Sequence, residues 1–381
     1  MKLILKGSLA ASFLAASLAL PSLGHAQDYT IDFGGRYMLD YTVADISGPD
    51  SKIRDEEIRR LRAKVSGKLG SKWSYKVETT IDTESDGLNL ILEDAYVQFK
   101  PGIGNWAFVF GQDNTTVSML EQESSLHSGT YERAAFTDAF GFSRRLGVIA
   151  KTSGDNYSFS AGVFSSNLEG EGGGSTDNGK AASAHATYNP IKTDDKVVHL
   201  GAYWRYRDKG DDSSDLRYRQ RPFTHVAPSR IINTGRFAKS DNTFGLEAAA
   251  IAGRFWAASE VSLLKANGSG TNPDADFSGF SGEAGVFFGG QKGYKGNKFT
   301  RPKVDKPFGQ GGLGAVSFIA HYDNLDLQDA VYTGKLVTFV LGADWWPTSK
   351  TRVGVNYFNA DAENGSADKG EGFVARAQFE F

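Results

Sequence analysis

The sequence predicts an all-β protein, namely a transmembrane antiparallel β-barrel of about 16 strands with long external loops. Three observations predict it. The chain opens with an export signal, most of it consists of segments in which apolar and polar residues alternate, and the connections between these segments alternate between short and long. Successive side chains of a strand point to opposite faces, so these segments fit lipid on one face and water on the other. We expect a signal peptide at residues 1–26 and one barrel domain at residues 27–381.

The N-terminal segment has the parts of a cleaved secretory signal. Lys2 and Lys6 give it a positive start, Leu9–Leu20 is a short apolar core, and Gly24 and Ala26 are small residues suited to cleavage. The apolar core is too short for a spanning helix, and no later stretch reaches the ~18 consecutive apolar residues that such a helix needs. If the mature chain enters a membrane, it must cross with strands.

Alternation is clearest at two places. In the final segment, FVARAQFEF, every second residue from Phe373 to Phe381 is apolar. In Arg60–Leu69, leucine, alanine and valine fall on one face, whereas arginine, lysine and serine fall on the other. A soluble β-sandwich would also alternate, but it would bury its apolar faces in a core. Tryptophans near strand ends, such as Trp73 and Trp106, favour the barrel because they suit a membrane interface.

The connections support the same fold. The short ones are Gly70–Lys72, Ser153–Asn156, Ala252–Arg254 and Pro347–Lys350, and the long ones are Gln112–Arg144, Asn167–Lys180 and Asp208–Ser240. Short turns on one side and long loops on the other are typical of membrane barrels. One connection, Gly289–Gly312, should be a short turn according to the alternation of short and long connections along the chain, but it is long and rich in lysine. Either the strand count slips there or this turn is specialised.

Composition limits the possible chemistry. Cysteine is absent, so there is no disulfide or thiol chemistry, and the six histidines are dispersed without zinc-type spacing. We therefore predict no cofactor, no metal site and no enzyme, although a Ser/His pair can still meet across strands. Net charge is −3, and removal of Lys2 and Lys6 makes it −5. This balance predicts no nucleic-acid partner, and any anion binding must come from local clusters of basic residues.

Such clusters exist. One strand begins with Arg59, Arg60 and Arg62, and a later loop carries arginine at every second position; these are Arg217, Arg219 and Arg221. Alternate spacing places three guanidinium groups on one side of an extended segment. Guanidinium forks match phosphate oxygens, and a row of them along a pore would pass an anion from site to site. The alternative is that these are solvated loop charges paired with nearby aspartates.

A second basic cluster occupies the exceptional connection. Its residues are Lys292, Lys295, Lys298, Arg301, Lys303 and Lys306. These residues are consistent with an exit site for anions. They are equally consistent with a flexible basic loop that binds acidic partners. Elsewhere, the acidic residues between Asp82 and Glu93 approach the spacing of a calcium loop, but strands flank them, and a cation site there stays open.

Taken together, the order and spacing of several stretches resemble the phosphate-selective porin O/P family. The stretches that carry this resemblance are Arg59–Asp82, Leu92–Phe99, Phe110–Val148, Arg217–Pro222 and Arg301–Leu327. The resemblance implies a homotrimeric barrel of 16 strands in the bacterial outer membrane. It also implies that long external loops fold inward, namely a third loop that narrows the pore and a fifth loop that carries an arginine ladder. A C-terminal strand ending in Phe381 implies recognition by the outer-membrane assembly machinery.

Residue by residue, the resemblance implies a ladder of Arg217, Arg219 and Arg221. It implies a constriction of Arg59, Arg60, Arg62 and Arg133, with Asp94 as the carboxylate that faces it, and a periplasmic basic cluster of Lys292, Lys295, Lys298, Lys303 and Lys306. A carboxylate there would accept a hydrogen bond from a protonated phosphate oxygen, which sulfate does not offer.

The chain departs from the family pattern at the third loop. Strongly phosphate-selective members carry lysines there, whereas this chain has Glu121 and Glu123. At ~5 Å and an effective dielectric constant of ~20, one pair of unit charges interacts by ~3 kcal/mol, so these acids would repel a dianion. From the basic clusters and the resemblance, we predict a passive anion channel for phosphate or a related oxyanion such as pyrophosphate or polyphosphate. The alternatives are a general or sugar-type diffusion pore and an exported soluble β-sandwich that binds carbohydrate or acts as an adhesin.

Overall fold

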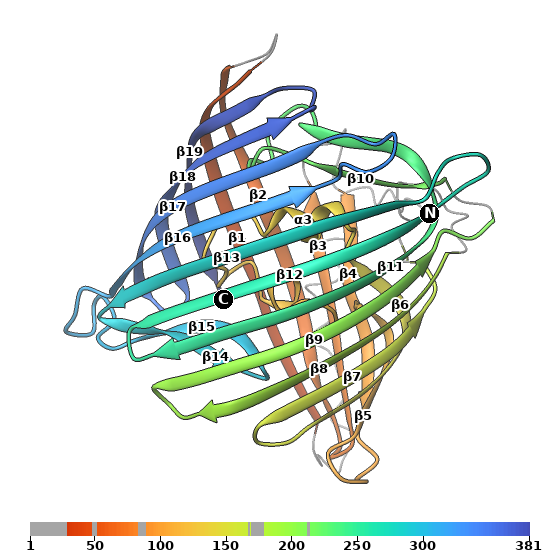
Figure 1. The fold of residues 1–381 in the computed structure, drawn as a ribbon. Coiled ribbons are helices and arrows are strands. Elements are labelled where there is room, and N and C mark those ends of the chain that lie inside the picture. The colour runs from red at the N-terminus through yellow and green to blue at the C-terminus, as the bar shows by residue number, and fades with distance from the viewer. Residues whose placement is uncertain (1–28, 48–51, 83–88, 167, 169–178, 212–213) are drawn as a thin grey trace.

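The computed structural model describes residues 29–47, 52–82, 89–166, 168, 179–211 and 214–381. The predicted signal peptide, and Glu84, Asp86 and Gly87 of the calcium-like run, lie outside these residues. Within them, one antiparallel sheet closes on itself because β1 pairs with both β2 and β19 (Figure 1). The predicted barrel of 16 strands is confirmed. No helix in this part of the chain has the length and hydrophobicity to span a membrane.

The barrel strands follow one another around the ring in chain order. They are β1 (Tyr29–Ile46), β2 (Lys52–Leu69), β3 (Trp73–Asp82), β4 (Asn89–Phe99), β5 (Ala107–Asn114), β6 (Arg144–Ser153), β7 (Tyr157–Phe164), β8 (Lys180–Lys192), β9 (Lys196–Asp208), β11 (Ile232–Ala252), β12 (Phe255–Gly268), β13 (Ala275–Phe288), β16 (Ala315–Asp326), β17 (Lys335–Thr348), β18 (Thr351–Glu363) and β19 (Lys369–Glu380). Five further elements lie within the connections: α2 (Met119–Gln122), α3 (Ala135–Ala139), β10 (Leu216–Gln220), β14 (Gly290–Lys295) and β15 (Lys298–Val304).

The outward face of the sheet is apolar, as the alternation predicts. In β19 the residues that share a face with Phe373 and Phe379 are exposed, whereas their neighbours Val374, Arg376 and Gln378 are buried inside the barrel. Large apolar side chains are exposed on other strands too, and Trp73 and Trp345 are 43% and 40% exposed near strand ends. An apolar outer band flanked by aromatic residues is what hydrocarbon and its interfaces require of a barrel.

The connection between β5 and β6, residues 115–143, lies inside the barrel; we call it loop 3 (Figure 1). Strands on one side of the ring bind its backbone. The Met119 amide donates to Glu247 on β11 (2.8 Å), and Arg352 on β18 donates to the Ser128 carbonyl (2.9 Å). The Tyr131 amide donates to Asn356 on β18 (2.9 Å). Buried polar groups are costly without partners, so these bonds fix the loop against that wall.

The interior of that wall also carries many apolar side chains beside these polar groups, which an apolar-outside, polar-inside alternation does not predict. Phe277, Leu336 and Phe358 point inward and are almost fully buried. Phe136 and Phe140 of loop 3 belong to the same buried cluster. Part of the barrel interior is therefore a hydrophobic core that packs the inserted loop, and a cavity with a mostly polar lining lies between loop 3 and strands β1–β8.

The loop between β9 and β11, which we call loop 5, crosses the mouth of the barrel. Its strand β10 pairs with β11, and Tyr218 of β10 is buried against Phe140 of loop 3. Further along, His225 Nδ1 lies 2.7 Å from Glu57 on β2, and the hydroxyls of Thr42 and Thr224 are 3.2 Å apart. The loop thus joins opposite sides of the ring and narrows the opening.

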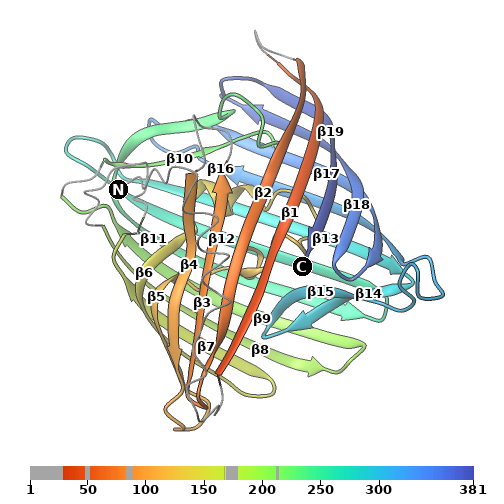
Figure 2. The same cartoon turned by 180° about the vertical axis from the view of Figure 1, so that it is seen from behind.

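The long connection at residues 289–314 lies on the side of the short turns, so the strand count does not slip. It forms the hairpin β14–β15, which lies near the C-terminus in the opening of the barrel (Figure 2). The hairpin contacts loop 3, because Lys292 Nζ lies 2.8 Å from Glu123 and Lys298 donates to the Gln122 carbonyl (2.9 Å). The connection is specialised because its hairpin contacts loop 3 from the side of the short turns.

The Lys292–Glu123 ion pair is fully enclosed, since each side chain is 2% exposed. Lys292 Nζ also donates to the His127 carbonyl (2.7 Å) and lies over the rings of Trp256 (4.4 Å) and Phe299 (4.8 Å). Removing one partner of a buried pair leaves the other charge uncompensated in a site of low polarity.

We expect Lys292→Met to lower the free energy of unfolding by about 3–5 kcal/mol, because Glu123 is left buried without its counter-ion. The measurement is guanidinium unfolding in detergent micelles followed by tryptophan fluorescence. The double variant Lys292→Met/Glu123→Leu should regain much of the loss. Lys369→Met, which breaks the exposed pair with Glu371, serves as the control and should leave the midpoint unchanged. Equal midpoints for Lys292→Met and wild type would contradict this role.

Candidate functional site

Three cavities follow one another between loop 3, loop 5 and the opposite wall. The turn-side cavity has a volume of about 530 Å³, the middle cavity about 300 Å³ and the outer cavity about 210 Å³. The first two share Arg60, Glu121, Ser125 and Arg133, which we call the neck. The middle and outer cavities share Asp138 and Arg230. A solute that follows these cavities must pass the neck.

A β-bulge in β2 places two consecutive arginines inside. Met38 of β1 pairs with Arg60, whereas the next residue, Leu39, pairs with Ile58, so Arg59 is the additional residue. Without the bulge, adjacent side chains would point to opposite faces. Here Arg60 lines both sides of the neck and Arg59 lines the middle cavity.

Arg60 is the least engaged guanidinium of the neck. It donates to the Ser125 hydroxyl (3.0 Å), and it takes part in no ion pair in the described part of the chain. Arg133 is held by loop 3 itself, since it donates to the carbonyls of Leu120 (3.0 Å) and Glu123 (2.8 Å). The two guanidinium groups therefore face the passage from the wall and from the loop respectively.

Arg59, in contrast, is neutralised. It binds Glu132 of loop 3 with two hydrogen bonds of 2.7 and 2.9 Å. Burial alone would raise the pKa of Glu132, but the charge and hydrogen bonds of Arg59 outweigh burial and lower it to about 2. The pair stays ionised near neutral pH, so Arg59 anchors loop 3 more than it adds charge to the passage.

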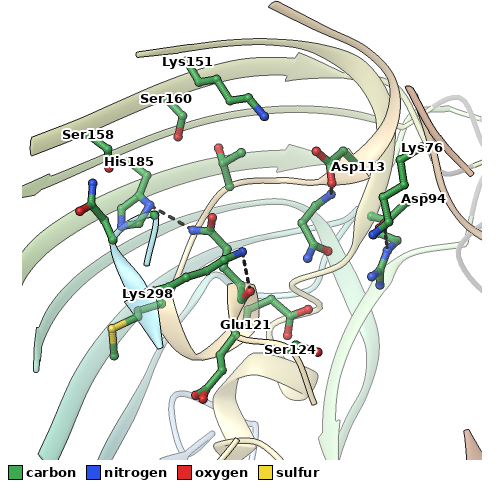
Figure 3. A pocket seen from close by; sticks show the side chains of 18 of the residues that line it. Lys76, Asp94, Asp113, Glu121, Ser124, Lys151, Ser158, Ser160, His185 and Lys298 are labelled. Atoms are coloured by element: carbon green, nitrogen blue, oxygen red, sulfur yellow. Dashed lines mark hydrogen bonds and ion pairs between the residues drawn. The ribbon is translucent and has the colours of Figure 1, made fainter. Parts of the chain in front are cut away.

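Arg62 and Asp94 belong to a closed chain of ion pairs on the wall. A second bulge sets Glu78 of β3 opposite both Glu93 and Asp94 of β4, so these consecutive acids both point inward. The pairs that close the chain are Arg62–Glu78 (3.2 Å), Arg62–Glu93, Glu93–Arg144 (2.9 Å), Arg144–Asp94, Asp94–Lys76 and Lys76–Glu78 (3.0 Å). Asp94 lines the same cavity as the neck arginines, but its ion-pair partners are Lys76 and Arg144 instead (Figure 3).

Sequence reasoning left several pore-lining cations out of the site. Arg36 donates to the hydroxyls of Ser124 and Ser125 (both 3.3 Å) and to Glu78 (3.1 Å). Lys76 and Arg144 also line the turn-side cavity. Alternation within the first strand could have identified Arg36. Tyr37 and Leu39 are exposed on the outer face, so Arg36, which has the opposite parity, points inward.

Glu121 is the carboxylate of the neck. It lies in α2, whose N-terminal Ser118 hydroxyl accepts a hydrogen bond from the Glu121 amide (3.1 Å). Its side chain points into the cavity in Figure 3, and its nearest cation is Arg133, with 3.6 Å between Nε and Oε2. Burial raises the pKa of Glu121, and the positive charge of Arg133 opposes that rise.

The three residues of the predicted ladder lie along two cavities. Arg217 and Arg219 line the outer cavity, and Arg221 lines the middle one. In β10 the intervening Leu216 and Tyr218 are buried, which turns the arginines toward the opening. Partial burial, and then the like charges of Arg217 and Arg230, lower the pKa of Arg219 to about 10, so it stays charged near neutral pH.

The lysine-rich connection does not form one open cluster. Lys292 is buried in its pair with Glu123, and Lys298 lines the turn-side cavity opposite Lys76 and Asp94 (Figure 3). Lys303 lines a separate cavity between the hairpin and the turns of β6–β7 and β8–β9. Lys295 and Lys306 are exposed at the turn side. Only Lys298 of the five therefore combines with the neck residues around one cavity.

All three cavities carry an excess of positive charge, in contrast to the whole chain. Nine basic and five acidic side chains line the turn-side cavity, five and four line the middle one, and seven and two line the outer one. Walls of low dielectric constant focus such a field into the passage. The arrangement can attract anions and pass them along without covalent chemistry.

Comparison with known proteins agrees with this geometry. Residues 31–381 match the family model described as phosphate-selective porin O and P. An uncharacterised protein of Caulobacter vibrioides is 34% identical over 314 residues, which cover 79% of this chain and 62% of that protein's length. Porin O of Pseudomonas aeruginosa is 24% identical over 401 residues, covering 93% of this chain and 89% of its own.

Solved structures show the same fold. The anion-selective porin from Comamonas acidovorans superposes with a TM-score of 0.62 at 12% identity, covering 93% of this chain and 100% of its own. The trimer form of OmpT from Vibrio cholerae gives a TM-score of 0.58 at 14% identity, again covering 93% and 100%. With the family model matched over nearly its whole length, the chain belongs to the phosphate-selective porin O and P family and is an outer-membrane β-barrel porin.

Proposed function

We propose that this porin is a passive channel for anions and that its solutes are phosphate or related oxyanions. The observation that carries the proposal is the excess of basic over acidic side chains around each of the three successive cavities. A chain of net charge −3 has concentrated its cations along the passage, which favours anions over cations.

The arrangement supports a sequence of three steps. Arg217 and Arg219 in the outer cavity attract an anion, and Arg221 passes it to the middle cavity. Arg60 and Arg133 then replace part of its hydration shell at the neck. Lys298 and the ion-pair chain of the wall receive it on the turn side. Many weak sites in series keep binding strong enough for entry and weak enough for release.

A general or sugar-type diffusion pore is the second candidate, and Glu121 is the observation that favours it. A carboxylate beside Arg133 in the neck lowers the local positive charge and weakens the attraction for dianions. As the assembly, we propose a homotrimer, the form in which the OmpT structure of Vibrio cholerae was described. Extraction of the protein without detergent would contradict a barrel in lipid.

We expect Arg60→Ala and Arg133→Ala each to lower the permeability of chloride relative to potassium severalfold, because each removes a positive charge from the narrow part of the path. Zero-current potentials across planar bilayers in a potassium chloride gradient measure this ratio. Arg54→Ala, which removes an exposed arginine near the outer end of β2, is the matched control and should leave the ratio unchanged. Unchanged potentials in both neck variants would remove the neck from the proposal.

We expect millimolar phosphate to reduce the chloride current of wild-type channels, because phosphate occupies the neck longer than chloride does. Single-channel recordings with added phosphate measure the reduction. Arg60→Ala should require a higher phosphate concentration for the same block. A chloride current that is indifferent to phosphate would favour the general diffusion pore.

The chloride-over-potassium permeability should rise as pH falls. Burial raises the pKa of Glu121, so Glu121 gains a proton at a higher pH than a solvated glutamate does, and the neck then loses a negative charge. Zero-current potentials between pH 8 and pH 5 test this dependence. Glu121→Gln should show the high selectivity already at pH 8 and little change with pH. A variant that keeps the full wild-type pH dependence would assign it to another group.

A further inference from the structure

We propose that Glu247 is a positioning residue of the neck, that it acts together with His185 and His199, and that its hold on loop 3 weakens when these two imidazoles gain a second proton. The three side chains belong to β11, β8 and β9 and are almost completely buried. They act on the neck through α2, the short helix of loop 3 that contains Glu121. The proposal rests on the channel function proposed above, because a change in the neck is observed through the current.

Glu247 is a buried carboxylate that receives hydrogen bonds from three directions. Its Oε1 lies 2.7 Å from His185 Nε2 and 3.0 Å from His199 Nε2, and its Oε2 accepts from the Met119 amide of α2 (2.8 Å). Gly201 on β9 leaves the space that this side chain needs, because a Cβ at that position would lie 2.4 Å from Oε1. A buried carboxylate requires such donors, so the site is built around the charge of Glu247.

The tautomer of His199 follows from the groups on its other side. The Val198 carbonyl accepts from the Asn189 side-chain amide (3.2 Å), and this amide also donates to the Tyr294 hydroxyl on the hairpin (2.7 Å). The hydroxyl therefore has its hydrogen available for His199 Nδ1, which lies 2.7 Å away. Nδ1 is then an acceptor, and the ring hydrogen is on Nε2, which donates to Glu247. The neutral imidazole thus completes a chain of donors that runs from the hairpin to Glu247.

His185 forms the corresponding link to loop 3. Its Nε2 faces Glu247, so Nδ1 of the neutral ring is an acceptor, and the side-chain nitrogen of Gln122 lies 3.1 Å from it. The helix α2 is thereby bound at both ends, by the Met119 amide and by the Gln122 side chain. His185 also lines the turn-side cavity (Figure 3), so protons from solution can reach the cluster.

The position of α2 determines the position of two neck residues. Glu121 is part of the helix, and the Leu120 carbonyl accepts the hydrogen bond of Arg133 Nε (3.0 Å). The Leu120 amide donates in turn to Glu260 on β12 (3.3 Å). A shift of α2 away from the wall would therefore move Glu121 and Arg133 together. Because the wall side is packed, such a shift is directed into the cavity between loop 3 and β1–β8 and would narrow the passage.

A second proton reverses the role of Nδ1 in each imidazole. Its new N–H group meets the Tyr294 hydroxyl and the side-chain nitrogen of Gln122, both of which are donors in the neutral arrangement. Tyr294 has no simple alternative, because Asn189 already donates to its oxygen. Buried donors without acceptors are costly, so we expect acid to loosen the links that join the two rings to the hairpin and to α2.

The titratable groups that face Glu247 come from several elements packed against it. They are His185 on β8, His199 and Tyr203 on β9, Glu260 on β12 and Tyr294 on β14. Loop 3 contributes the uncharged amide groups of Met119 and Gln122. The two tyrosines keep their protons in acid, so the imidazoles and Glu260 are the groups that can take up a proton. The variants below separate the imidazoles from Glu260.

The test is the frequency of partial closures in single-channel recordings at constant voltage. In wild type it should rise about tenfold between pH 7.5 and pH 5.5, which is the change in the doubly protonated fraction of a free imidazole over this range. The variant His185→Gln/His199→Gln keeps a side-chain N–H donor on each side of Glu247 but binds no second proton. Its closure frequency should therefore be independent of pH, whereas Glu260→Gln should retain the rise.

Two single variants test the positioning role at pH 7.5. Glu247→Gln replaces one accepting oxygen by a donor, so partial closures should already be frequent at this pH. Tyr294→Phe removes the hydroxyl that fixes His199 and should raise their frequency as well. The matched controls are Glu371→Gln, at an exposed carboxylate of β19, and Tyr188→Phe, at an exposed tyrosine of β8, and both should behave as wild type.

A wild-type current without additional closures at pH 5.5 would overturn the proposal. A double histidine variant that keeps the full pH dependence would do the same, and loss of the rise in Glu260→Gln alone would assign it to Glu260. Wild-type behaviour of Glu247→Gln at pH 7.5 would reject the positioning role. If this variant does not assemble, the histidine double variant and Tyr294→Phe still decide the question.

Two other effects are distinguishable from these closures. Failure of the anion-channel function would appear as a lack of chloride over potassium preference in the wild type, whereas closures are counted from the size of the current steps. Protonation of Glu121 changes the zero-current potential of the open channel, and Glu121→Gln should keep the pH dependence of the closures.

Discussion

Hydrogen bonds from one wall of the barrel to the backbone of loop 3 determine where the passage runs. Glu247, Asn356 and Arg352 bind backbone groups that would otherwise be buried without partners. Because the loop lies against β11–β19, the open space is displaced toward β1–β8, where the arginines of β2 line it. The hairpin β14–β15 closes the arrangement from the turn side through the Lys292–Glu123 pair. Fold and neck thus depend on the same set of buried polar contacts.

Charge is arranged in two different ways along the passage. The wall of β2–β6 combines acids and bases in a closed chain of ion pairs, which is rigid and nearly neutral. The neck and the outer loop contain guanidinium groups, such as Arg60 and Arg219, that take part in no ion pair within the described residues and are available to a solute. The first arrangement holds the geometry, and the second provides the attraction.

Much of the fold was predictable from alternation, because lipid on one face and water or packed loops on the other impose a period of two. The rows from Phe373 to Phe381 and the alternation of turn lengths gave the barrel. The exact partners of the site residues were not predictable, because they depend on two β-bulges. No residue type near Arg59 or Glu93 marks a bulge, and each bulge turns a neighbouring pair of charged residues inward. The family resemblance implies that Asp94 faces the neck arginines, and in the structure its ion-pair partners are Lys76 and Arg144.

Because of the bulge, Arg59 lines the middle cavity without taking part in the pairing of β2 with β1. The additional residue makes no pair with β1, so a chain shortened by that one position would keep the register on either side and lose one inward guanidinium. Such a loss would also remove the partner of Glu132, so the stretch of loop 3 that borders the middle cavity would no longer be tied to β2.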